Sequence, residues 1–316
     1  MIAPFKSLLG AAVAGLLLAG PAGAWGPEGH EIVAEIALYY LTPIARAAVD
    51  DVLGEYKLGD YDVASWPDSI RGEKEYDRRY PGNGRWHFID FDTRQRYDEK
   101  FKLEVSEDGH DVVTQILRWR DDLRGGQLRG GRRLDALRFL VHFVGDVHQP
   151  LHCAFRYGDM GGNMLPVHSF AGRNHAFDSA NELDYAPSLH SVWDENLVYE
   201  LVANRRTKDV VRELQREITP DQVRGWMHDD VLRWANDSYW LARKKAYRWS
   251  NGENLPFKWS GPGMDLTGAN YIDGQIPVVR EQLQKAGVRL AGLLNSAFDP
   301  DWRPPRRETL AQKEKP

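Results

Sequence analysis

Cysteine is almost absent from this chain, since Cys153 is the only one among its 316 residues. A single thiol excludes an intramolecular disulfide bond, and it also excludes the thiolate clusters that hold structural zinc. The fold must therefore be stabilised by packing and, where metals are involved, by ligands other than sulfur.

The chain also lacks a strong excess of charge of either sign. Its 41 Lys and Arg residues stand against 46 Asp and Glu residues, which leaves a net charge of −5. This balance excludes a global basic field for binding nucleic acid, so any polyanionic substrate would have to be attracted locally, by metal ions or by a few arginines. The hydrophobic share of 42% is ordinary for a folded globular protein.

Long apolar runs are missing after the first 24 residues. That segment carries Lys6, an apolar stretch over 8–19, and Ala22-Gly23-Ala24, which together predict a signal peptide cleaved before Trp25. No later segment approaches the roughly 18 apolar residues of a membrane span. We therefore expect an exported protein, periplasmic or extracellular, without membrane insertion or an obligate protein partner. Residues 25–302 should form a single folded domain, with 303–316 as a flexible tail.

The spacing of apolar residues indicates a mostly helical protein. Regular strand alternation, βα units and internal repeats are not visible in the sequence, so we expect an all-α fold. Two segments, 57–100 and 153–188, show little periodicity and read as long irregular loops, which are often functional. The expected helices cover residues 31–53 with a break at Pro43, and residues 112–123, 134–147, 192–202, 210–218, 231–247 and 276–294.

Histidine and aspartate recur at a spacing that suits metal binding. His142 and Asp146 stand four residues apart in an expected helix, so both side chains project from one face. His190 and Asp194 repeat this arrangement, and His152 follows the turn after the first pair. Imidazole and carboxylate groups are the ligands of catalytic zinc sites.

Each such pair also has a simpler explanation. A lone His-x-x-x-Asp pair is more often a surface hydrogen-bond pair than a metal site. His142, however, lies between Val141 and Phe143, where an unsatisfied imidazole would be costly, and a ligand role removes that cost. For Trp66, Trp86 and Trp193, which lie beside candidate ligands, core packing is the preferred interpretation.

Taken together, the motifs resemble the S1/P1 nuclease family, which shares a helical fold with the zinc-dependent bacterial phospholipases C. They span most of the chain after residue 24 and follow the family order. The matching segments are Trp25-Gly26-Pro27-Glu28-Gly29-His30, Trp66-Pro67-Asp68-Ser69-Ile70-Arg71, Trp86-His87-Phe88-Ile89-Asp90, the run from His142 to His152, Gly161-Gly162-Asn163, and His190-Ser191-Val192-Trp193-Asp194.

The resemblance implies three zinc ions per chain. One would be held by Asp68, His87, His142 and Asp146. A second would take the free α-amine and carbonyl oxygen of Trp25 together with His30, and would share Asp146 with the first. The third, set apart, would be held by His152, His190 and Asp194. Sharing a carboxylate is chemically sound because its two oxygens can bridge cations about 3.5–4 Å apart. The remaining histidines match no ligand position: His110, His148, His168, His175 and His228.

The same resemblance implies roles in catalysis for Asp68 and Arg71. A paired zinc site would lower the pKa of a bound water to near neutrality and supply the nucleophile that attacks phosphorus. Asp68 would orient that nucleophile. Arg71, three residues later, would compensate the negative charge that builds up on the phosphoryl oxygens.

Phe88, Asp90 and Asn163 are the candidate substrate-binding residues. An aromatic face beside the metals can stack a base, and a carboxylate can accept hydrogen bonds from a base edge. Since bases in a duplex are not free to stack in this way, single strands should be cut best. The resemblance implies activity on single-stranded RNA and DNA with 5′-mononucleotide products, and on terminal 3′-phosphates.

Two other functions remain open at this point. One is a zinc-dependent phospholipase C on the same scaffold, against which Asp194 and the Phe88–Asp90 pair argue. The other is a secreted zinc-binding protein without catalysis, against which Arg71 argues, because storage needs no anion clamp. The sequence also departs from the family pattern in the long segment between His152 and His190, which we expect near the rim of the cleft.

Overall fold

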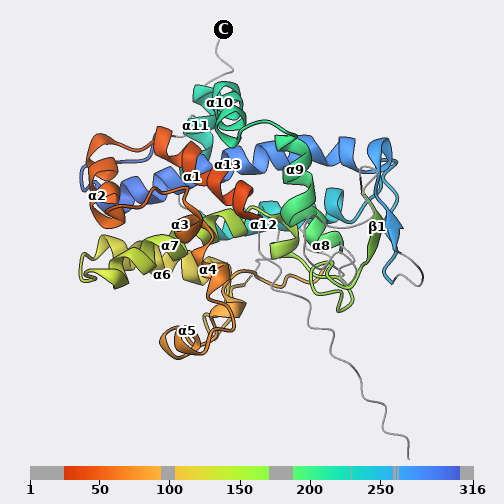
Figure 1. The fold of residues 1–316 in the computed structure, drawn as a ribbon, viewed down its shortest axis with the longest axis horizontal. Coiled ribbons are helices and arrows are strands. Elements are labelled where there is room, and N and C mark those ends of the chain that lie inside the picture. The colour runs from red at the N-terminus through yellow and green to blue at the C-terminus, as the bar shows by residue number, and fades with distance from the viewer. Residues whose placement is uncertain are drawn as a thin grey trace, which may run out of the picture.

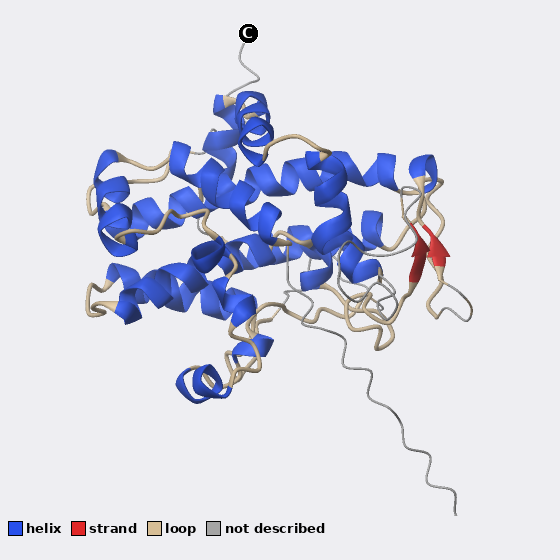
Figure 2. Ribbon diagram, in the orientation of Figure 1, coloured by secondary structure: helices blue, strands red, loops and turns tan. Residues whose placement is uncertain are grey.

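The computed structural model describes residues 25–93, 104–170, 188–228, 230–258, 261 and 263–306. The predicted signal peptide, the last ten residues of the predicted tail, and residues 171–187 of the segment between His152 and His190 lie outside this part of the chain. The predicted all-α class is confirmed, as Figures 1 and 2 show a body built almost wholly of helices. Among the described helices, none is long and apolar enough to cross a membrane.

The longest helix, α13 (Ile272–Phe298), is the axis of the fold. It packs along α1 (Pro27–Tyr39) and also contacts α2 (Pro43–Leu53), α6 (Val112–Arg124), α7 (Gly131–Asp146) and α9 (Leu197–Val202). In Figure 1, α1 and α13 run side by side above α6 and α7. Because α7 also touches α1, α3 (Tyr61–Ala64) and α4 (Trp66–Ser69), it lies at the centre of the helices that carry the first half of the motifs.

Local capping explains where several of these helices begin. Thr42 accepts a hydrogen bond from the amide of Ala45 and Pro43 occupies the first turn of α2, so the chain breaks between α1 and α2 as the proline predicted. The Asp111 side chain caps α6 in the same way. Thr219 and Gln222 form a capping box at the start of α11 (Pro220–Trp226).

The remaining elements surround this body. Helices α10 (Thr207–Glu217) and α11 cover one side, and α12 (Val231–Leu241) continues into the π-helical turn η4 (Ala242–Ala246). The short strands β1 (Val167–Ser169) and β2 (Met264–Asp265) form a parallel pair at one end, with Val167 opposite Met264. Other short elements are α5 (Lys74–Arg79), η1 (Asn83–Arg85), η2 (Pro150–Cys153), α8 (Leu189–Ser191), η3 (Val192–Asn196) and η5 (Gly268–Asn270).

The segment expected to be an irregular loop over 57–100 is partly helical where it is described. It contains α3, α4, α5 and η1, each of three to six residues. Elements this short complete at most two helical turns, so they leave no periodic pattern in the sequence. Strand β1 lies in the second expected loop and was not predicted.

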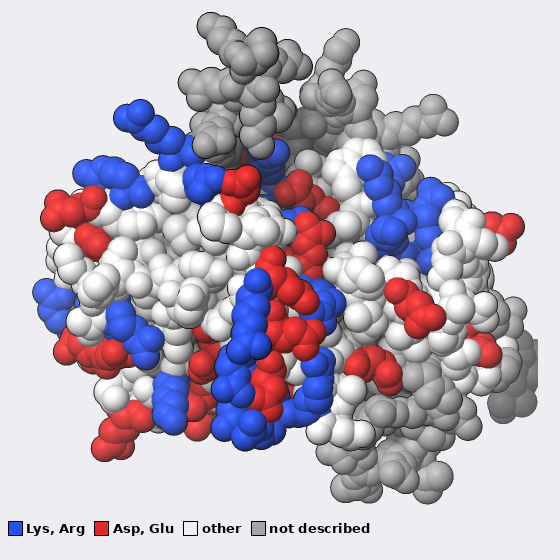
Figure 3. Space-filling view, turned by 90° about the horizontal axis from the view of Figure 1, so that it is seen from above, with Lys and Arg blue, Asp and Glu red and all other residues white. Residues whose placement is uncertain are grey.

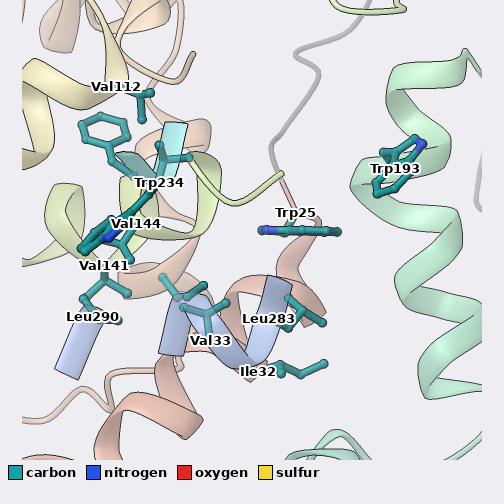
Figure 4. Packing of buried hydrophobic residues seen from close by; sticks show 14 of the residues in the cluster. Trp25, Ile32, Val33, Val112, Val141, Val144, Trp193, Trp234, Leu283 and Leu290 are labelled. Atoms are coloured by element: carbon teal, nitrogen blue, oxygen red, sulfur yellow. The ribbon is translucent and has the colours of Figure 1, made fainter. Parts of the chain in front are cut away.

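A single hydrophobic core joins these elements, and tryptophans are prominent in it. Trp25, Trp193 and Trp234 are fully buried or nearly so, together with Ile32, Val144 and Leu283, and Figure 4 shows them within one packed cluster. The core interpretation of Trp66, Trp86 and Trp193 is confirmed, since all three are buried. The indole of Trp193 also donates a hydrogen bond of 2.7 Å to the Tyr271 hydroxyl.

The close approach of α1 and α13 depends on Gly287. A Cβ at this position would lie 2.4 Å from Cγ2 and 2.5 Å from Cβ of Ile36. We expect Gly287→Ala to lower the melting temperature, because overpacking costs about 1–3 kcal/mol and exceeds the gain of about 1 kcal/mol in helix propensity.

Gly225→Ala is the matched control, since Gly225 lies in helix α11 and a Cβ there would meet nothing within 4 Å. It should leave the melting temperature unchanged or raise it. Equal melting temperatures for the two variants would show that α1 and α13 tolerate a wider separation than the structure has.

Candidate metal centre

Three groups of His and Asp side chains, all buried except the partly exposed Asp68, come together in the structure. Within each group the candidate ligand atoms all lie within 4.8 Å of one another. We call them the first cluster (Asp68, His87 and His142), the second cluster (His30, His142 and Asp146) and the third cluster (His152, His190 and Asp194). The structure thus brings together eight of the nine residues predicted to bind metal, and the ninth, Trp25, is buried nearby.

Asp146 joins the first two clusters, as predicted for a shared carboxylate. Its Oδ2 lies 3.0 Å from Nδ1 of His87, while its Oδ1 lies 3.4 Å from Nε2 of His142 and 3.5 Å from Nε2 of His30. The two oxygens therefore face different histidines. This arrangement suits a carboxylate that bridges two cations.

Asp68 completes the first cluster from the open side. Its Oδ1 lies 3.4 Å from Nδ1 of His87 and its Oδ2 lies 3.5 Å from Nε2 of His142. Arg71, one helical turn later, places Nη1 3.4 Å from the same Oδ1. The side chains of Asp68 and Arg71 are 17% and 20% exposed, whereas those of His87, His142 and Asp146 are fully buried, so a ligand would approach the cluster along Asp68 and Arg71.

The third cluster is built on a distorted helix. His190 lies in α8 and Asp194 in the π-helical turn η3, so the spacing of four predicted on one regular helix spans an α-to-π transition. Nε2 of His190 still lies 3.4 Å from Oδ2 of Asp194, and Nε2 of His152 lies 3.7 Å from Oδ1. Single π-helical turns of this kind are frequent at functional sites.

Backbone carbonyls hold three of the imidazoles in one orientation. Nδ1 of His142, His152 and His190 lies 2.8, 2.6 and 2.7 Å from the carbonyl oxygens of Ala64, His87 and Gly161. Donating the Nδ1 proton to a carbonyl leaves the lone pair on Nε2, which is the atom that faces the cluster. Carbonyl partners of this kind fix the tautomer and orientation of metal-binding histidines.

Several atoms in the clusters are buried without a hydrogen-bond partner. They include Nε2 of His30 and His152, Oδ1 of Asp146 and Oδ2 of Asp194. In addition, Nδ1 of His87 and Nε2 of His142 face each other at 3.1 Å. Unpaired buried polar atoms are rare and costly, and a bound cation would satisfy them. The residues present therefore fit bound divalent metal ions.

The protonation of these groups supports the same conclusion. Burial lowers the pKa of His30, His87 and His152, and it lowers that of His190 to about 4. Neutral imidazole is the form that binds metal.

The carboxyl groups respond to burial in two ways. Burial raises the pKa of Asp146 and Asp194, which shows that their anionic forms need a compensating cation. Burial acts in the same direction on Asp68, but His142 and His87 outweigh it and hold its pKa below the usual range.

Two supporting residues, Gln149 and Gly145, were not found from the sequence. Gln149 donates a 2.6 Å hydrogen bond to Oδ1 of Asp194 and accepts one from the amide of Leu151, which fixes the carboxylate of the third cluster. Gly145 leaves room for His30, because a Cβ there would lie 2.6 Å from its Nδ1. A glycine inside a predicted helix, between His142 and Asp146, was the signal that could have indicated this packing.

Trp25 lies close to residues of the second and third clusters. Its indole is fully buried, and the next residue, Gly26, donates a 2.7 Å hydrogen bond to the carbonyl oxygen of Asp194. Its Cδ1 is 3.7 Å from the position of a Cβ on Gly145, the residue before Asp146. The start of the described chain therefore lies between the second and third clusters.

The candidate substrate residues are close in the chain to His87 and to Gly161, whose carbonyl oxygen holds His190. Phe88 directly follows His87 and is half-buried, while Asp90 is exposed. Asn163 is half-buried, and its Nδ2 donates a 2.9 Å hydrogen bond to the carbonyl oxygen of Met160. All three residues were proposed from the family motifs in which they occur, and their roles in substrate binding stay predictions.

The other histidines lie apart from the clusters where they are described. His148 is buried and bonds to the Val144 carbonyl oxygen and to Arg289, and His168 is bonded to the Gly263 carbonyl oxygen. His110 packs on Trp86, and His228 lies in a pocket beside Trp302. His175 lies outside the described residues.

Comparison with known proteins identifies relatives of this chain. A family model described as S1/P1 Nuclease matches residues 25–299. Endonuclease 2 of Arabidopsis thaliana is 30% identical over 288 residues, which cover 87% of this chain and 90% of that protein. Nuclease P1 of Penicillium citrinum is 27% identical over 298 residues, covering 86% and 97%. Nuclease S1 of Aspergillus oryzae is 28% identical over 305 residues, covering 91% and 96%.

Gly161 offers a test of the third cluster. Its φ is +63°, and a Cβ would lie 2.7 Å from the Leu151 carbonyl oxygen and 3.2 Å from Nδ1 of His190. We expect Gly161→Ala to displace His190 and weaken metal binding at the third cluster about 10–100-fold. Elemental analysis after dialysis against a fixed free metal concentration would measure the loss of one ion per chain.

Gly158→Ala is the matched control for backbone strain. Gly158 has a φ of +74° in the same loop, but a Cβ at this position would meet nothing within 4 Å. The control should keep the full metal content. If both variants lost metal equally, strain in the loop rather than contact with His190 would be responsible.

Proposed function

The chain belongs to the S1/P1 nuclease family, and we propose that it is an exported phosphodiesterase that uses three zinc ions to hydrolyse single-stranded RNA and DNA to 5′-mononucleotides, with 3′-nucleotidase activity. The observation that carries this proposal is the convergence of unpartnered buried ligand atoms beside the exposed edge of Asp68 and Arg71. Closed structural metal sites have no such edge, whereas catalytic sites keep one position open.

The ligand chemistry favours zinc over magnesium or calcium. The clusters combine imidazole nitrogen with carboxylate oxygen, whereas magnesium and calcium prefer all-oxygen surroundings. Asp68, His87, His142 and Asp146 would hold one ion, and His152, His190 and Asp194 another. The remaining ion would take His30, Asp146 and the α-amine and carbonyl oxygen of Trp25. Burial of Trp25 beside the clusters supports this last assignment.

The residues of the first cluster suit phosphoryl transfer. When bound, zinc would activate a water molecule and withdraw electrons from the phosphate ester. Asp68, an anion at the open edge, would accept a hydrogen bond from the attacking water and fix its orientation. Arg71 would donate to the phosphoryl oxygens as their negative charge grows. The 3.4 Å contact between Arg71 and Asp68 would hold the guanidinium in place before substrate arrives.

Phe88, Asp90 and Asn163 would select single strands. The half-buried ring of Phe88 follows a ligand directly, so a base stacked on it would place its phosphate near the metals. The exposed carboxylate of Asp90 would accept hydrogen bonds from the base edge. Because Nδ2 of Asn163 already donates to the Met160 carbonyl oxygen, its Oδ1 is the atom that would face a base as an acceptor.

Export would complete the metal site. Cleavage before Trp25 would free an α-amine, which has a reference pKa of about 7.7–8.0 and can lose its proton to a metal at neutral pH. An amide nitrogen within the chain is a poor ligand. The mature terminus must then begin at Trp25, which ties the predicted signal peptide to the chemistry of the second cluster.

We expect elemental analysis to find about three zinc ions per chain in the mature protein. A form that keeps a few extra residues ahead of Trp25 should hold one fewer zinc ion and lose most activity, while its circular dichroism spectrum stays helical. Equal zinc content and turnover in both forms would contradict the terminal ligand. At most one zinc ion in active mature protein would contradict the whole scheme.

The substrate class is tested by comparing single-stranded RNA and DNA with phosphatidylcholine. Wild-type protein should cleave the nucleic acids. Phe88→Ala should retain its zinc but lose the stacking of one base, which is worth about 1–3 kcal/mol of binding free energy, and its KM should rise accordingly. Tyr61→Ala, which removes a 55% exposed ring elsewhere, is the control and should behave as wild type. Hydrolysis of phosphatidylcholine without cleavage of nucleic acid would show a phospholipase instead.

A further inference from the structure

A pocket is lined in part by residues that follow the His87 and His152 segments in the chain. It is a pocket of about 200 Å³ whose described lining combines basic, aromatic and small polar side chains. The lining residues are Thr93, Arg156, Tyr157, Arg243, Tyr247, Arg248, Asn254 and Phe257. Three arginines and three aromatic rings thus meet in one pocket, and none of these eight lining residues is acidic.

Arg156 is the fixed positive group of this pocket. It is only 4% exposed, and its Nη1 and Nη2 donate to the carbonyl oxygens of Leu255 and Pro256 at 2.8 and 2.7 Å. Its guanidinium also lies 4.4 Å from the ring centre of Tyr247 and 4.7 Å from that of Phe257. Nε has no hydrogen-bond partner, since the nearest carboxylate oxygen, on Asp159, is 3.8 Å away. The cation is therefore held rigidly, mainly by neutral groups.

The second basic group, Arg248, is oriented in a similar way. Its Nε donates to the Arg243 carbonyl oxygen at 3.0 Å and its Nη1 to the Gly252 carbonyl oxygen at 2.7 Å. These partners are neutral, and a guanidinium has five N–H donors in total. Arg248 can therefore keep both bonds and still donate to an anion.

An exposed pair of aromatic rings forms the outer edge of the pocket. Tyr157 and Phe257 are 50% and 48% exposed, and their ring centres lie 4.4 Å apart in an edge-to-face contact. Tyr157 has a φ of +53°, a conformation that is unfavourable for a residue with a side chain of this size. Strain of this kind is concentrated at functional sites, where the surrounding structure maintains it.

Backbone hydrogen bonds connect the pocket to the candidate metal centre. The amide of Ile89 donates to the His152 carbonyl oxygen, and further along the amide of Thr93 donates to the Phe155 carbonyl oxygen. The two segments that carry His87 and His152 therefore run together until they reach the pocket at Thr93 and Arg156. Arg156 is the fourth residue after His152, so their Cα atoms are at most about 14 Å apart.

We infer that this pocket is a second nucleotide-binding subsite, which holds a nucleotide of the substrate strand away from the bond that is cut. Its arginines would bind a backbone phosphate, and the rings of Tyr157 and Phe257 would stack a base, the combination by which proteins bind single strands without sequence preference. This inference rests on the proposed nuclease function, and it implies that longer strands bind more tightly than short ones.

The test compares an octanucleotide with a dinucleotide, which has little chain left to reach the pocket once its phosphodiester lies at the metals. Tyr157→Gly removes the ring and suits the positive φ, and Phe257→Ala removes its partner. In the double variant the ratio of the octanucleotide KM to the dinucleotide KM should rise about tenfold. Tyr157→Phe should retain the wild-type ratio, and so should the control Tyr39→Ala, which removes a 69% exposed ring elsewhere.

A charge variant tests the phosphate contact separately. Arg243→Gln should reduce the slope of log affinity against log salt by about 0.7 for a phosphorothioate octanucleotide, the value for one phosphate contact on a single strand. Arg46→Gln, at an exposed pair with Asp50, should leave the slope unchanged.

The outcomes separate the subsite from the proposed function. If wild-type protein cleaves both substrates but the double variant keeps the wild-type KM ratio, the subsite is wrong and the nuclease function stands. If wild-type protein cleaves neither, the nuclease function is wrong, and binding of the phosphorothioate octanucleotide still decides the subsite. A tenfold weaker affinity in the double variant would then support it, and an unchanged affinity would overturn it.

Discussion

The structure depends on one unfavourable feature, the burial of imidazoles and carboxylates that leaves several of their polar atoms without a hydrogen-bond partner. His87 and His142 face each other at 3.1 Å, and Asp146 is buried between them and His30. Packing alone gives no reason for such an arrangement, because each unpartnered polar atom costs free energy. Bound cations would satisfy these unpartnered atoms, so metal binding should contribute much of the stability of the folded chain. With a single cysteine, no disulfide within the chain can supply that stability instead.

The helices around the clusters can be understood as the frame for these ligands. Helix α7 carries His142 and Asp146 through the core, while α1 brings His30 to the same point because Gly145 leaves space for its ring. Carbonyl oxygens then fix the imidazoles, and one of them belongs to His87, which is itself a candidate ligand and orients His152. The first and third clusters are therefore mechanically connected, so a change in the position of His87 also moves a ligand of the third cluster.

The sequence predicted the helical class, the longer helices and the set of residues that meet at the clusters, because each leaves a local signal. Apolar spacing marks long helices, and His-x-x-x-Asp pairs on helices mark ligands. The supporting contacts could not be predicted in the same way. The carbonyl oxygens of Ala64 and Gly161 leave no trace in residue identity, and Gln149 is an ordinary polar residue until its partner Asp194 is known. Such contacts depend on how distant segments are placed, which periodicity does not encode.

Charge is distributed in a way that agrees with local rather than global attraction of a substrate. On the face that carries α10 and α11, basic and acidic side chains alternate (Figure 3), and Arg205, Arg212 and Arg280 pair there with Asp209, Glu213 and Glu217. Paired surface charges contribute little long-range field. In the pocket beside Arg156, by contrast, the two guanidinium groups of Arg156 and Arg248 donate to neutral carbonyl oxygens. In a chain with a net charge of −5, such carbonyl-bound arginines, together with bound metal ions, would attract a polyanion locally. Among the described residues, Arg156 and the candidate metal ligands both lie along the paired segments that start at His87 and His152.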